Sequence, residues 1–321
     1  LREVPLLNPP RNLDAISGLD ARVPLFWEEP EPTSAHLLGY IIYRSNIIST
    51  DSIGYVPAAV TAYIDFDVYN FLYYQYFVVA DYVEGRSDES NRVWANPRPQ
   101  ADEPQVLIYD FDNGATVCFD QTTGSAEALA TTFDNLDIPY DMTGQDASLE
   151  EYDIFRYRAI FISTGIRDLV NDKIRPDDIE RIKNFILAGG GVYWEGADVG
   201  QDYFANGSEE ERWLFGLFGA EFADDGRGRM QGNVQLLYGD TDFFREPVSV
   251  AYAYRTLADM RLDEFNTVEG TDIMNSQSTP APNVSTIRMV ARDAPNLKTV
   301  LSSVYIGAIS NGSGANTREY I

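Results

Sequence analysis

The chain has 321 residues, a formal net charge of −26 and a hydrophobic fraction of 44%. Its length exceeds the usual size of a single hydrophobic core, so two domains are expected. An acidic surface of this strength repels phosphates and anionic lipid, which excludes nucleic acid as a partner. The charge is compatible with a solvated surface, with cation binding or with an extracellular location.

Cysteine and histidine each occur once, as Cys118 and His36. A single cysteine excludes an internal disulfide, and the two residues together cannot build a Cys/His zinc cluster. The sequence contains no apolar run near the roughly 20 residues that span a bilayer, so no membrane insertion is expected. It opens at Leu1 without an initiator Met or a signal segment, which suggests a processed product or an excised fragment.

The first hundred residues predict a β sandwich. Short β-branched and aromatic runs recur between turn signals, as in "ARVPLFWEEP", "LLGYIIYRSN" and "TAYIDFDV". In "YYQYFVVA" the alternation places one set of side chains on a single face of a half-buried antiparallel strand. This set is Tyr74, Tyr76, Val78 and Ala80.

Residues 9–97 resemble a fibronectin type III domain. Trp27 stands where the family has its core tryptophan, and Tyr74 stands at the position of the tyrosine corner. The resemblance implies a spacer or adhesive module. We interpret its many aromatic side chains as core and inter-domain packing rather than as a ligand platform, and His36 as an incidental loop residue. The aromatic residues considered are Tyr63, Tyr69, Phe71, Tyr73 and Phe77.

A short connector is expected after this sandwich. "NPRPQADEP", residues 96–104, contains three prolines and mixed charges, which is typical of a stiff linker. We therefore predict a sandwich over residues 1–98, a linker over 99–104 and a second domain over 105–321.

The second domain alternates strands and helices. "QVLIYDF", "RAIFISTG" and "GGGVYWEG" are near-continuous apolar strands, and amphipathic helices separate them. This pattern predicts an α/β fold with a doubly wound, mostly parallel sheet covered on both faces. The side chains expected to face the sheet from the two helices are Leu129, Phe133, Leu136, Ile179, Ile182 and Ile186.

Further elements are expected in the later half. "GSEEERWLFGLFGAEFADDG" predicts a helix with an acidic start, whose core-facing residues are Trp213, Leu214, Leu217 and Phe218. "NVQLLYG", "VSVAYAYRT", "STIRMVARD" and "KTVLSSVYIGAI" predict more strands, several of them antiparallel. The last residues read as a loop and the first turn of a closing helix, so more sequence is expected to follow.

Residues 104–321 resemble the class I glutamine amidotransferase-like fold, which is flavodoxin-like. "VLIYDFDNG", "YRAIFISTG" and "FILAGGGVYWEG" carry this resemblance. Such domains occur beside fibronectin type III modules in large secreted bacterial proteins with C-terminal sorting signals. The pairing therefore implies a bacterial protein that is secreted or displayed on the cell surface.

The chemistry of an active amidotransferase is missing from the sequence. That chemistry needs a cysteine on a strand-to-helix elbow and a histidine that activates it. Cys118 lies in "NGATVCFD", away from an elbow motif, and His36 lies in the other domain. "WEGAD", with Glu195, occupies the place of the nucleophile. Ser163 has no histidine in its own domain to activate it, so a non-catalytic protein is the leading hypothesis.

Polar residues nevertheless follow the predicted strands. The carboxyl ends of parallel strands share one edge, which is the usual place for a site in such folds. Clustered carboxylates there favour calcium, magnesium or a sugar-binding cleft. The alternative is that they are caps and solvated turns left from an ancestral active site. The candidates are Asp110, Asp112, Asn113, Ser163, Thr164, Glu195 and Asp198, with Gln201 as a further possibility.

Three hypotheses of function remain open from the sequence, and one of them is a calcium-stabilised adhesin, whose melting temperature would rise with added calcium. The other two are as follows. The first is a structural, adhesive or assembly role, with other copies or cell-surface components as partners and an oligomer or filament as the assembly. The second is a hydrolase or carbohydrate-acting enzyme that uses the strand-end carboxylates, with or without a divalent metal. No other cofactor is expected.

Overall fold

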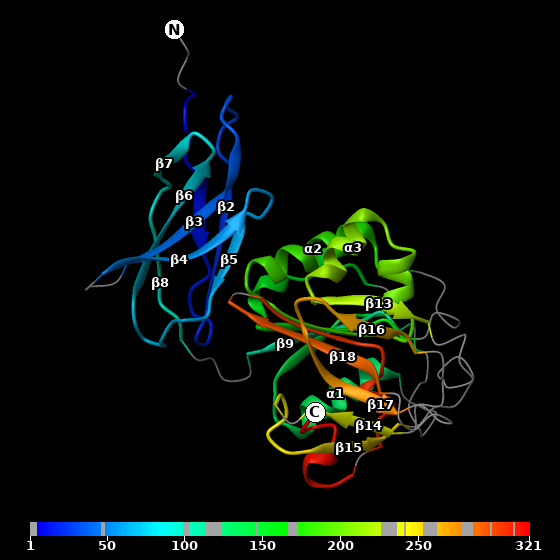
Figure 1. Ribbon diagram of the computed structural model, residues 1–321. Helices are drawn as coiled ribbons and strands as arrows, with labels where there is room; N and C mark the ends of the chain where they lie inside the picture. Colours follow the sequence, from blue (N-terminus) through cyan, green and yellow to red (C-terminus); the bar gives the residue numbers. More distant parts are fainter. Residues whose placement is uncertain are drawn as a thin grey trace. The chain divides into compact units, whose positions relative to one another are not determined.

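The computed structural model describes residues 5–45, 49–98, 103–112, 114, 124–145, 147–165, 173–225, 236–240, 242–252, 262–277, 285–295, 297–310 and 312–321. The chain divides into two compact units (Figure 1). One comprises residues 1–103 with 187–190, and the other comprises 104–186 with 191–321. Linker residues 99–102, Asn113 and Cys118 lie outside the described residues.

The first unit is a sandwich of two antiparallel sheets (Figure 1). One sheet has the order β1-β2-β5, and the other has the order β4-β3-β6-β7, with β8 also paired to β6. This confirms the expected all-β sandwich with a fibronectin type III-like strand arrangement. The strands are β1 (Arg11–Ala15), β2 (Val23–Glu28), β3 (Leu37–Ser45), β4 (Thr50–Pro57), β5 (Ala62–Asp65), β6 (Tyr74–Tyr82), β7 (Gly85–Glu89) and β8 (Val93–Ala95).

The core of this sandwich forms where the alternating faces of the two sheets meet. All four residues predicted for the inner face of β6 are buried there, as is Trp27 from β2. The Trp27 ring packs edge-on against Tyr40 of β3, with the ring centroids 5.3 Å apart. Such T-shaped pairs favour a specific packing of the two sheets, beyond the gain from burying apolar area.

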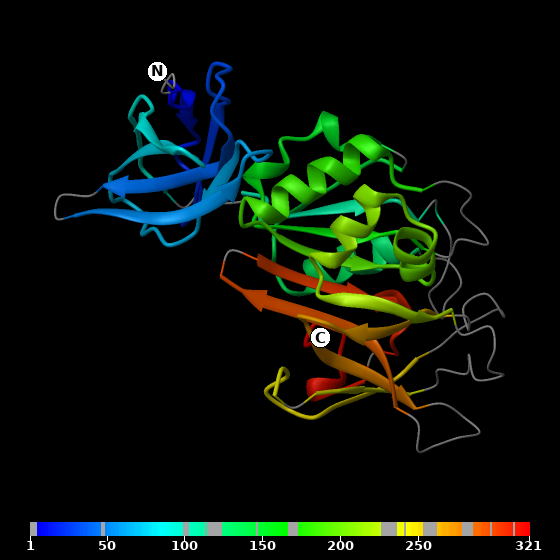
Figure 2. The same ribbon diagram turned by 45° about the horizontal axis from the view of Figure 1, so that its top comes forward.

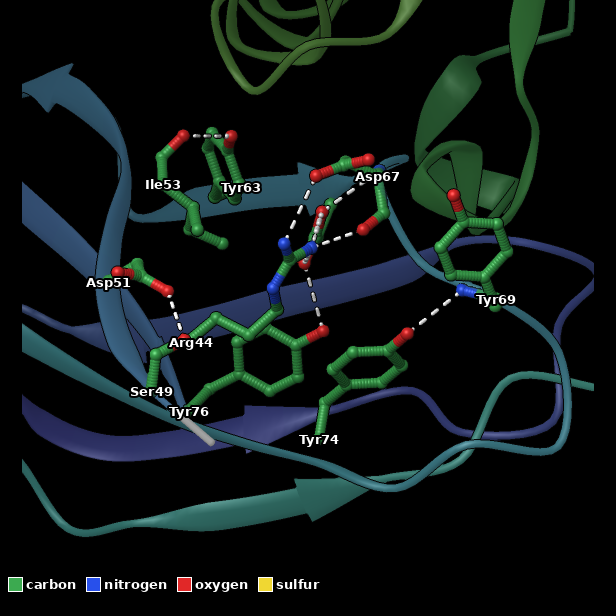
Figure 3. Close-up of polar contacts among 10 residues, drawn as sticks. Arg44, Ser49, Asp51, Ile53, Tyr63, Asp67, Tyr69, Tyr74 and Tyr76 are labelled. Atoms are coloured by element: carbon green, nitrogen blue, oxygen red, sulfur yellow. Dashed lines mark hydrogen bonds and ion pairs between the residues drawn. The ribbon is translucent and has the colours of Figure 1, made fainter. Parts of the chain in front are cut away.

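Tyr74 forms the expected tyrosine corner (Figure 3). Its hydroxyl accepts a hydrogen bond of 3.0 Å from the backbone nitrogen of Tyr69, five residues upstream. Beside it, the guanidinium of Arg44 lies 5.4 Å from the Tyr74 ring centroid and pairs with Asp65 at 2.9 Å. The Tyr76 hydroxyl donates to the same carboxylate at 3.0 Å. These contacts satisfy a charge that burial would otherwise penalise.

The aromatic residues of this unit divide into two groups. Tyr63 and Phe77 are buried, in agreement with the prediction of a packing role. Tyr69, Phe71 and Tyr73 do not lie in the core, since they are 73%, 65% and 62% exposed. The reason is that they occupy a turn between β5 and β6, where period-2 alternation no longer directs side chains inward.

The second unit contains one mixed sheet of 11 strands. Its main path runs β10-β9-β11-β12-β19-β18-β17-β14-β15, and β13 and β16 extend from β18. The first five strands are parallel and the others pair antiparallel, so the sheet is not mostly parallel. The strands are β9 (Val106–Asp110), β10 (Tyr140–Met142), β11 (Ala159–Ser163), β12 (Gly191–Glu195), β13 (Ala220–Asp224), β14 (Leu236–Gly239), β15 (Val248–Ala251), β16 (Glu264–Thr267), β17 (Thr271–Gln277), β18 (Ser285–Ala294) and β19 (Leu297–Ser302).

Helices lie on both faces of the parallel strands (Figure 2). On one face, Phe133 of α1 (Ser125–Asn135) packs edge-on against Phe161 of β11. On the other face, Tyr109 of β9 donates a 3.0 Å hydrogen bond to Asp178 of α2 (Pro176–Leu187). The helix α3 (Glu209–Gly216) lies on the side of α2 (Figure 1).

The structure corrects the sequence prediction for two side chains, for the end of one helix and for two strands. Leu136 follows the last turn of α1 and is 41% exposed, and Trp213 of α3 is 43% exposed, so neither faces the core. The third helix ends at Gly216, and the predicted tail of that helix is the strand β13. The strands β16 and β17 were not predicted, because polar side chains interrupt their sequences "EFNT" and "TDIMNSQ".

The first test concerns the tyrosine corner. Replacing Tyr74 by Phe removes the acceptor for the Tyr69 amide while keeping the ring, so we expect the first unit to lose about 1–2 kcal/mol in free energy of unfolding. Tyr73→Phe is the matched control, because Tyr73 is exposed. Urea unfolding of the full chain measures both. Equal stabilities of the two variants would show that the hydroxyl contributes nothing.

Candidate functional site

Four parallel strands end in one row of polar residues. The pairing register sets Asp110 of β9 beside Ser163 of β11, Ser163 beside Glu195 of β12, and Glu195 beside Ser302 of β19. Two residues earlier, Ile108, Phe161, Tyr193 and Val300 form an apolar row in the same register. Side chains two positions apart on a strand share a face, so both rows lie on the face that α1 covers.

Glu195 lies at the centre of the polar row and is fully buried. Its carboxylate accepts hydrogen bonds from the hydroxyl of Ser125, the first residue of α1, and from the Tyr193 hydroxyl at 2.8 Å. The backbone nitrogen of Ile306, which follows β19, donates a third at 3.0 Å. One side chain therefore ties together a strand, a helix start and the turn after the last parallel strand.

Burial raises the pKa of Glu195, because a buried carboxylate loses its hydration. The three donors oppose this shift. The buried Ser163 hydroxyl also lowers the pKa of Glu195, although it makes no full hydrogen bond. These groups favour the charged form of Glu195, but burial is the larger effect and the pKa remains raised.

Asp112 caps the start of α1. Its carboxylate is fully buried and accepts hydrogen bonds from the backbone nitrogens of Gly114 at 2.9 Å and Ala126 at 3.1 Å. Ala126 is in the first turn of α1, whose own N-cap residue, Gly124, supplies no side-chain cap. Asp112 therefore caps the helix from 14 positions upstream.

In the polar row, the carboxyl group of Asp110 has a pKa near neutrality. Burial, followed by the charge of Asp112, raises the pKa of Asp110 to about 7. Glu127 on the exposed side of α1 adds a smaller effect of the same sign. A carboxyl group near neutrality can exchange protons at physiological pH, as a general acid or base must.

The other predicted residues lie beside the row rather than in it. The Thr164 hydroxyl donates to the backbone oxygen of Glu195 at 2.9 Å. The backbone oxygen of Asp198 accepts from the nitrogen of Asp202 at 2.8 Å, in the turn that leads into the π-helical segment Gln201–Ala205. These residues close turns after β11 and β12.

The sequence reasoning missed Asp263, which is fully buried. One of its carboxylate oxygens accepts from the backbone nitrogens of Gly200 at 2.7 Å and Gln201 at 2.9 Å. Burial raises the pKa of Asp263 well above its ordinary value, and the charge of Asp198 acts in the same direction. Asp263 precedes β16, which was itself not predicted, so nothing in the sequence placed this carboxylate near residue 200.

The arrangement as a whole is a buried polar layer in which most groups are hydrogen-bonded, whereas the Ser163 hydroxyl and one carboxylate oxygen of Asp263 have no hydrogen-bond partner among the described residues. In the part of the chain that the structure describes, no three acidic, histidine or cysteine side chains are grouped to hold a metal ion. The carboxylates of Asp110, Asp112 and Glu195 instead accept backbone or hydroxyl donors, and Asp112 and Glu195 are inaccessible to solvent. Whether any of these residues binds a ligand stays a prediction.

Comparison with known proteins gives information on the fold alone. No protein-family model matches the chain, and no curated protein matches it. Among solved structures, the fn3 domain of human collagen alpha-1(XX) aligns at 22% identity over 30% of this chain and 90% of that chain, with a TM-score of 0.27. An Fn3-like protein from Clostridium thermocellum aligns at 20% identity over 30% and 98% of the two chains, with a TM-score of 0.24.

A crystal structure of titin domains aligns at 20% identity, with a TM-score of 0.27. That alignment covers 29% of this chain and 33% of the titin chain, so the shared part is one third of the titin structure.

Within the described residues, no helix has both the length and the apolar character to cross a membrane.

The second test concerns the contribution of the Glu195 hydrogen bonds to stability. Glu195→Ala leaves the Ser125 and Tyr193 hydroxyls and the Ile306 amide without an acceptor, so we expect the second unit to lose about 3 kcal/mol or more. Glu195→Gln keeps an acceptor and removes a costly buried charge, so we expect a loss of no more than about 1–2 kcal/mol. Urea unfolding measures both, and equal losses would contradict the hydrogen-bond account.

The third test uses the raised pKa of Asp110. Because its folded pKa of about 7 exceeds the unfolded value of about 3.9, the folded state holds the extra proton between these values. Stability should therefore fall as the pH rises from about 4 to about 7. Asp110→Asn should remove this fall and stabilise the protein at pH 8, because the variant carries no charge for burial to penalise. Parallel stability profiles of wild type and variant between pH 4 and pH 8 would refute the shift.

Proposed function

We propose that this chain is a non-catalytic binding and assembly module of a secreted or cell-surface bacterial protein, in which a fibronectin type III sandwich accompanies a degenerate amidotransferase-like domain. One observation carries this proposal. Glu195 stands at the strand end where relatives of the proposed fold would need a nucleophile, and its carboxylate is fully buried and hydrogen-bonded within the chain.

The topology of the parallel strands supports the amidotransferase-like part of the proposal. Numbered along the chain, the five parallel strands have the spatial order 2-1-3-4-5, which is the order of flavodoxin-like doubly wound folds. Helices on both faces of these strands fit the same interpretation. In this fold the polar row lies at the carboxyl edge, where relatives place their chemistry.

The state of that edge argues for a structural role. A catalytic nucleophile needs a hydrogen-bonded base and a substrate within reach. Ser163 is fully buried, and the group beside it is Glu195, which three other donors already occupy. The start of α1 lies against these atoms, because Ser125 of that helix donates to Glu195.

A carboxylate-based hydrolase is the second candidate, and one observation favours it. Asp110 has a pKa of about 7, which is suited to a general acid or base. Its neighbour Asp112 would have to remain charged for a two-carboxylate mechanism. Asp112 instead uses one carboxylate oxygen to accept from the backbone nitrogen of Gly114 and the other to accept from that of Ala126 in α1, which makes this candidate the weaker one.

The fourth test is a direct search for turnover. We expect the purified chain to release no ammonia from glutamine and no product from peptide or polysaccharide substrates above the buffer rate. Glu195→Gln, Asp110→Asn and Ser163→Ala should leave that background unchanged. Turnover that one of these substitutions abolishes, in a variant that remains folded by circular dichroism, would establish an enzyme and overturn the proposal.

A further inference from the structure

Glu103 lies in the predicted linker, but its side chain is buried in the first unit. One of its carboxylate oxygens pairs with the guanidinium of Arg22 at 2.5 Å, and the other accepts a hydrogen bond of 3.1 Å from the backbone nitrogen of Asp20. The side chain of Arg22 is also fully buried. Removing one member of a buried ion pair is costly, because the other charge then stays in the interior without this partner. Glu103 therefore ties the chain to the sandwich just before the second unit begins.

Three segments of the first unit meet where the chain leaves the sandwich. The turn segment, residues 18–22, lies between β1 and β2, and the aromatic loop, residues 69–73, lies between β5 and β6. The connector segment, residues 96–98 together with Glu103, follows β8. Each of the three segments is hydrogen-bonded to the other two.

The connector segment is bonded to the turn segment at both of its described ends. The backbone nitrogen of Gly18 donates to the Asn96 oxygen at 3.0 Å, and that of Arg98 donates to the Leu19 oxygen at 3.0 Å. Glu103 adds its contacts with the same turn. The turn segment thus depends on the connector segment for partners of its backbone groups.

The turn segment is also bonded to the aromatic loop. The Asn70 side chain of the loop donates to the Asp20 carboxylate at 2.6 Å and accepts from the Ala21 nitrogen at 2.8 Å. One side chain of the loop therefore holds two consecutive residues of the turn.

The aromatic loop is bonded to the connector segment as well. The Phe71 nitrogen donates to the Pro97 oxygen at 2.8 Å, and the Asn96 side chain donates to the Leu72 oxygen at 2.7 Å. Both bonds join the loop to residues that directly follow β8. The Tyr69 nitrogen is bound differently, by the tyrosine corner, which does not involve the connector segment (Figure 3).

Two residues of these segments have a strained backbone. Ala21 has a φ of 46° and Phe71 has a φ of 70°, both in the left-handed region that residues other than glycine rarely adopt. Such conformations cost free energy and persist where the surrounding contacts hold them. The nitrogen of each residue is held by a bond to one of the other segments. Loss of these bonds would therefore let both residues relax.

The aromatic loop also keeps apolar side chains in water. Four of them are each more than half exposed, namely Tyr69, Phe71, Leu72 and Tyr73. Exposed apolar surface raises the free energy of a loop relative to a conformation that covers it. The loop is thus held in this conformation by its bonds to the neighbouring segments, and not by burial of its own apolar side chains.

We propose that the connector segment is a strap that holds the aromatic loop in its exposed conformation, with the ion pair between Arg22 and Glu103 as the contact that keeps the strap closed. Loss of this ion pair releases the connector segment, and the turn segment and the loop then lose partners and relax together. The second unit begins at the next residue, Pro104, so a pull along the chain from that side acts on Glu103 before it acts on the rest of the connector segment. This strap lies within the first unit alone and is independent of the proposed function.

The fifth test measures amide hydrogen exchange of the full chain by NMR. In Glu103→Ala the Asp20 amide loses an acceptor directly. The Ala21 and Phe71 amides donate to other residues, and we expect each to exchange at least about tenfold faster than in the wild type, because the strap is open more of the time. The Trp27 amide, which is bonded within the sandwich, should keep its rate, and this separates release of the strap from loss of the fold.

Glu84→Ala is the matched control. Glu84 also accepts from a backbone nitrogen of the sandwich, that of His36 at 3.0 Å, but it lies outside the three segments. We expect it to leave the exchange rates of Ala21 and Phe71 at their wild-type values. Loss of protection at these amides in Glu84→Ala would show that they report general weakening of the sandwich, and this result would overturn the proposal.

Two results for the Glu103 variants would also contradict the strap. The first is a folded Glu103→Ala chain in which the Asp20 amide exchanges faster while the Ala21 and Phe71 amides keep their rates. The second concerns Glu103→Gln, which keeps an acceptor and removes only the charge, and which replaces the alanine variant if that variant does not fold. We expect a smaller acceleration of the same two amides in Glu103→Gln, and unchanged rates there would overturn the proposal.

Discussion

The burial of one carboxylate governs the architecture around the polar row. A charged group that is removed from water without hydrogen-bond donors around it lowers the free energy of unfolding by several kcal/mol. Glu195 finds them on a helix start, on its own strand and on the turn after β19, which are far apart in the sequence. The positions of α1 and of the Ile306 turn are therefore determined together with that of β12. The hydrogen bonds of Glu195 thus hold β12, the start of α1 and the Ile306 turn together at the polar edge of this sheet.

The sequence predicted those elements whose periodicity is undisturbed. The inner face of β6 and the ends of β9, β11 and β12 follow from alternation and from apolar runs, and the buried face of α2 follows from the spacing of its isoleucines. It did not predict β16 and β17, where cross-strand pairing in a wide sheet overrides weak local preference. It also placed Trp213 in the core, although that side chain is 43% exposed and its ring packs against the ammonium of Lys183, 4.3 Å from the ring centroid.

The sequence predicts where the candidate site lies, but not whether its carboxylates are hydrogen-bonded within the chain. Parallel strands bring Asp110, Ser163 and Glu195 to one edge, and the sequence order of strands and helices is enough to infer this. Their hydrogen-bond partners come from residues with no recognisable motif, such as Ser125 and the amide of Ile306. Whether a carboxylate is free to do chemistry or is committed to holding elements together depends on such partners. A single sequence does not contain that information.

Asp112 has a further consequence for how the chain responds to mutation. Its carboxylate binds backbone nitrogens at two points that are 12 positions apart in the sequence, Gly114 after β9 and Ala126 in the first turn of α1. A substitution that removes this carboxylate would leave both nitrogens without their acceptor at once. The effect of such a change would therefore not be confined to the end of β9, because the start of α1 depends on the same side chain.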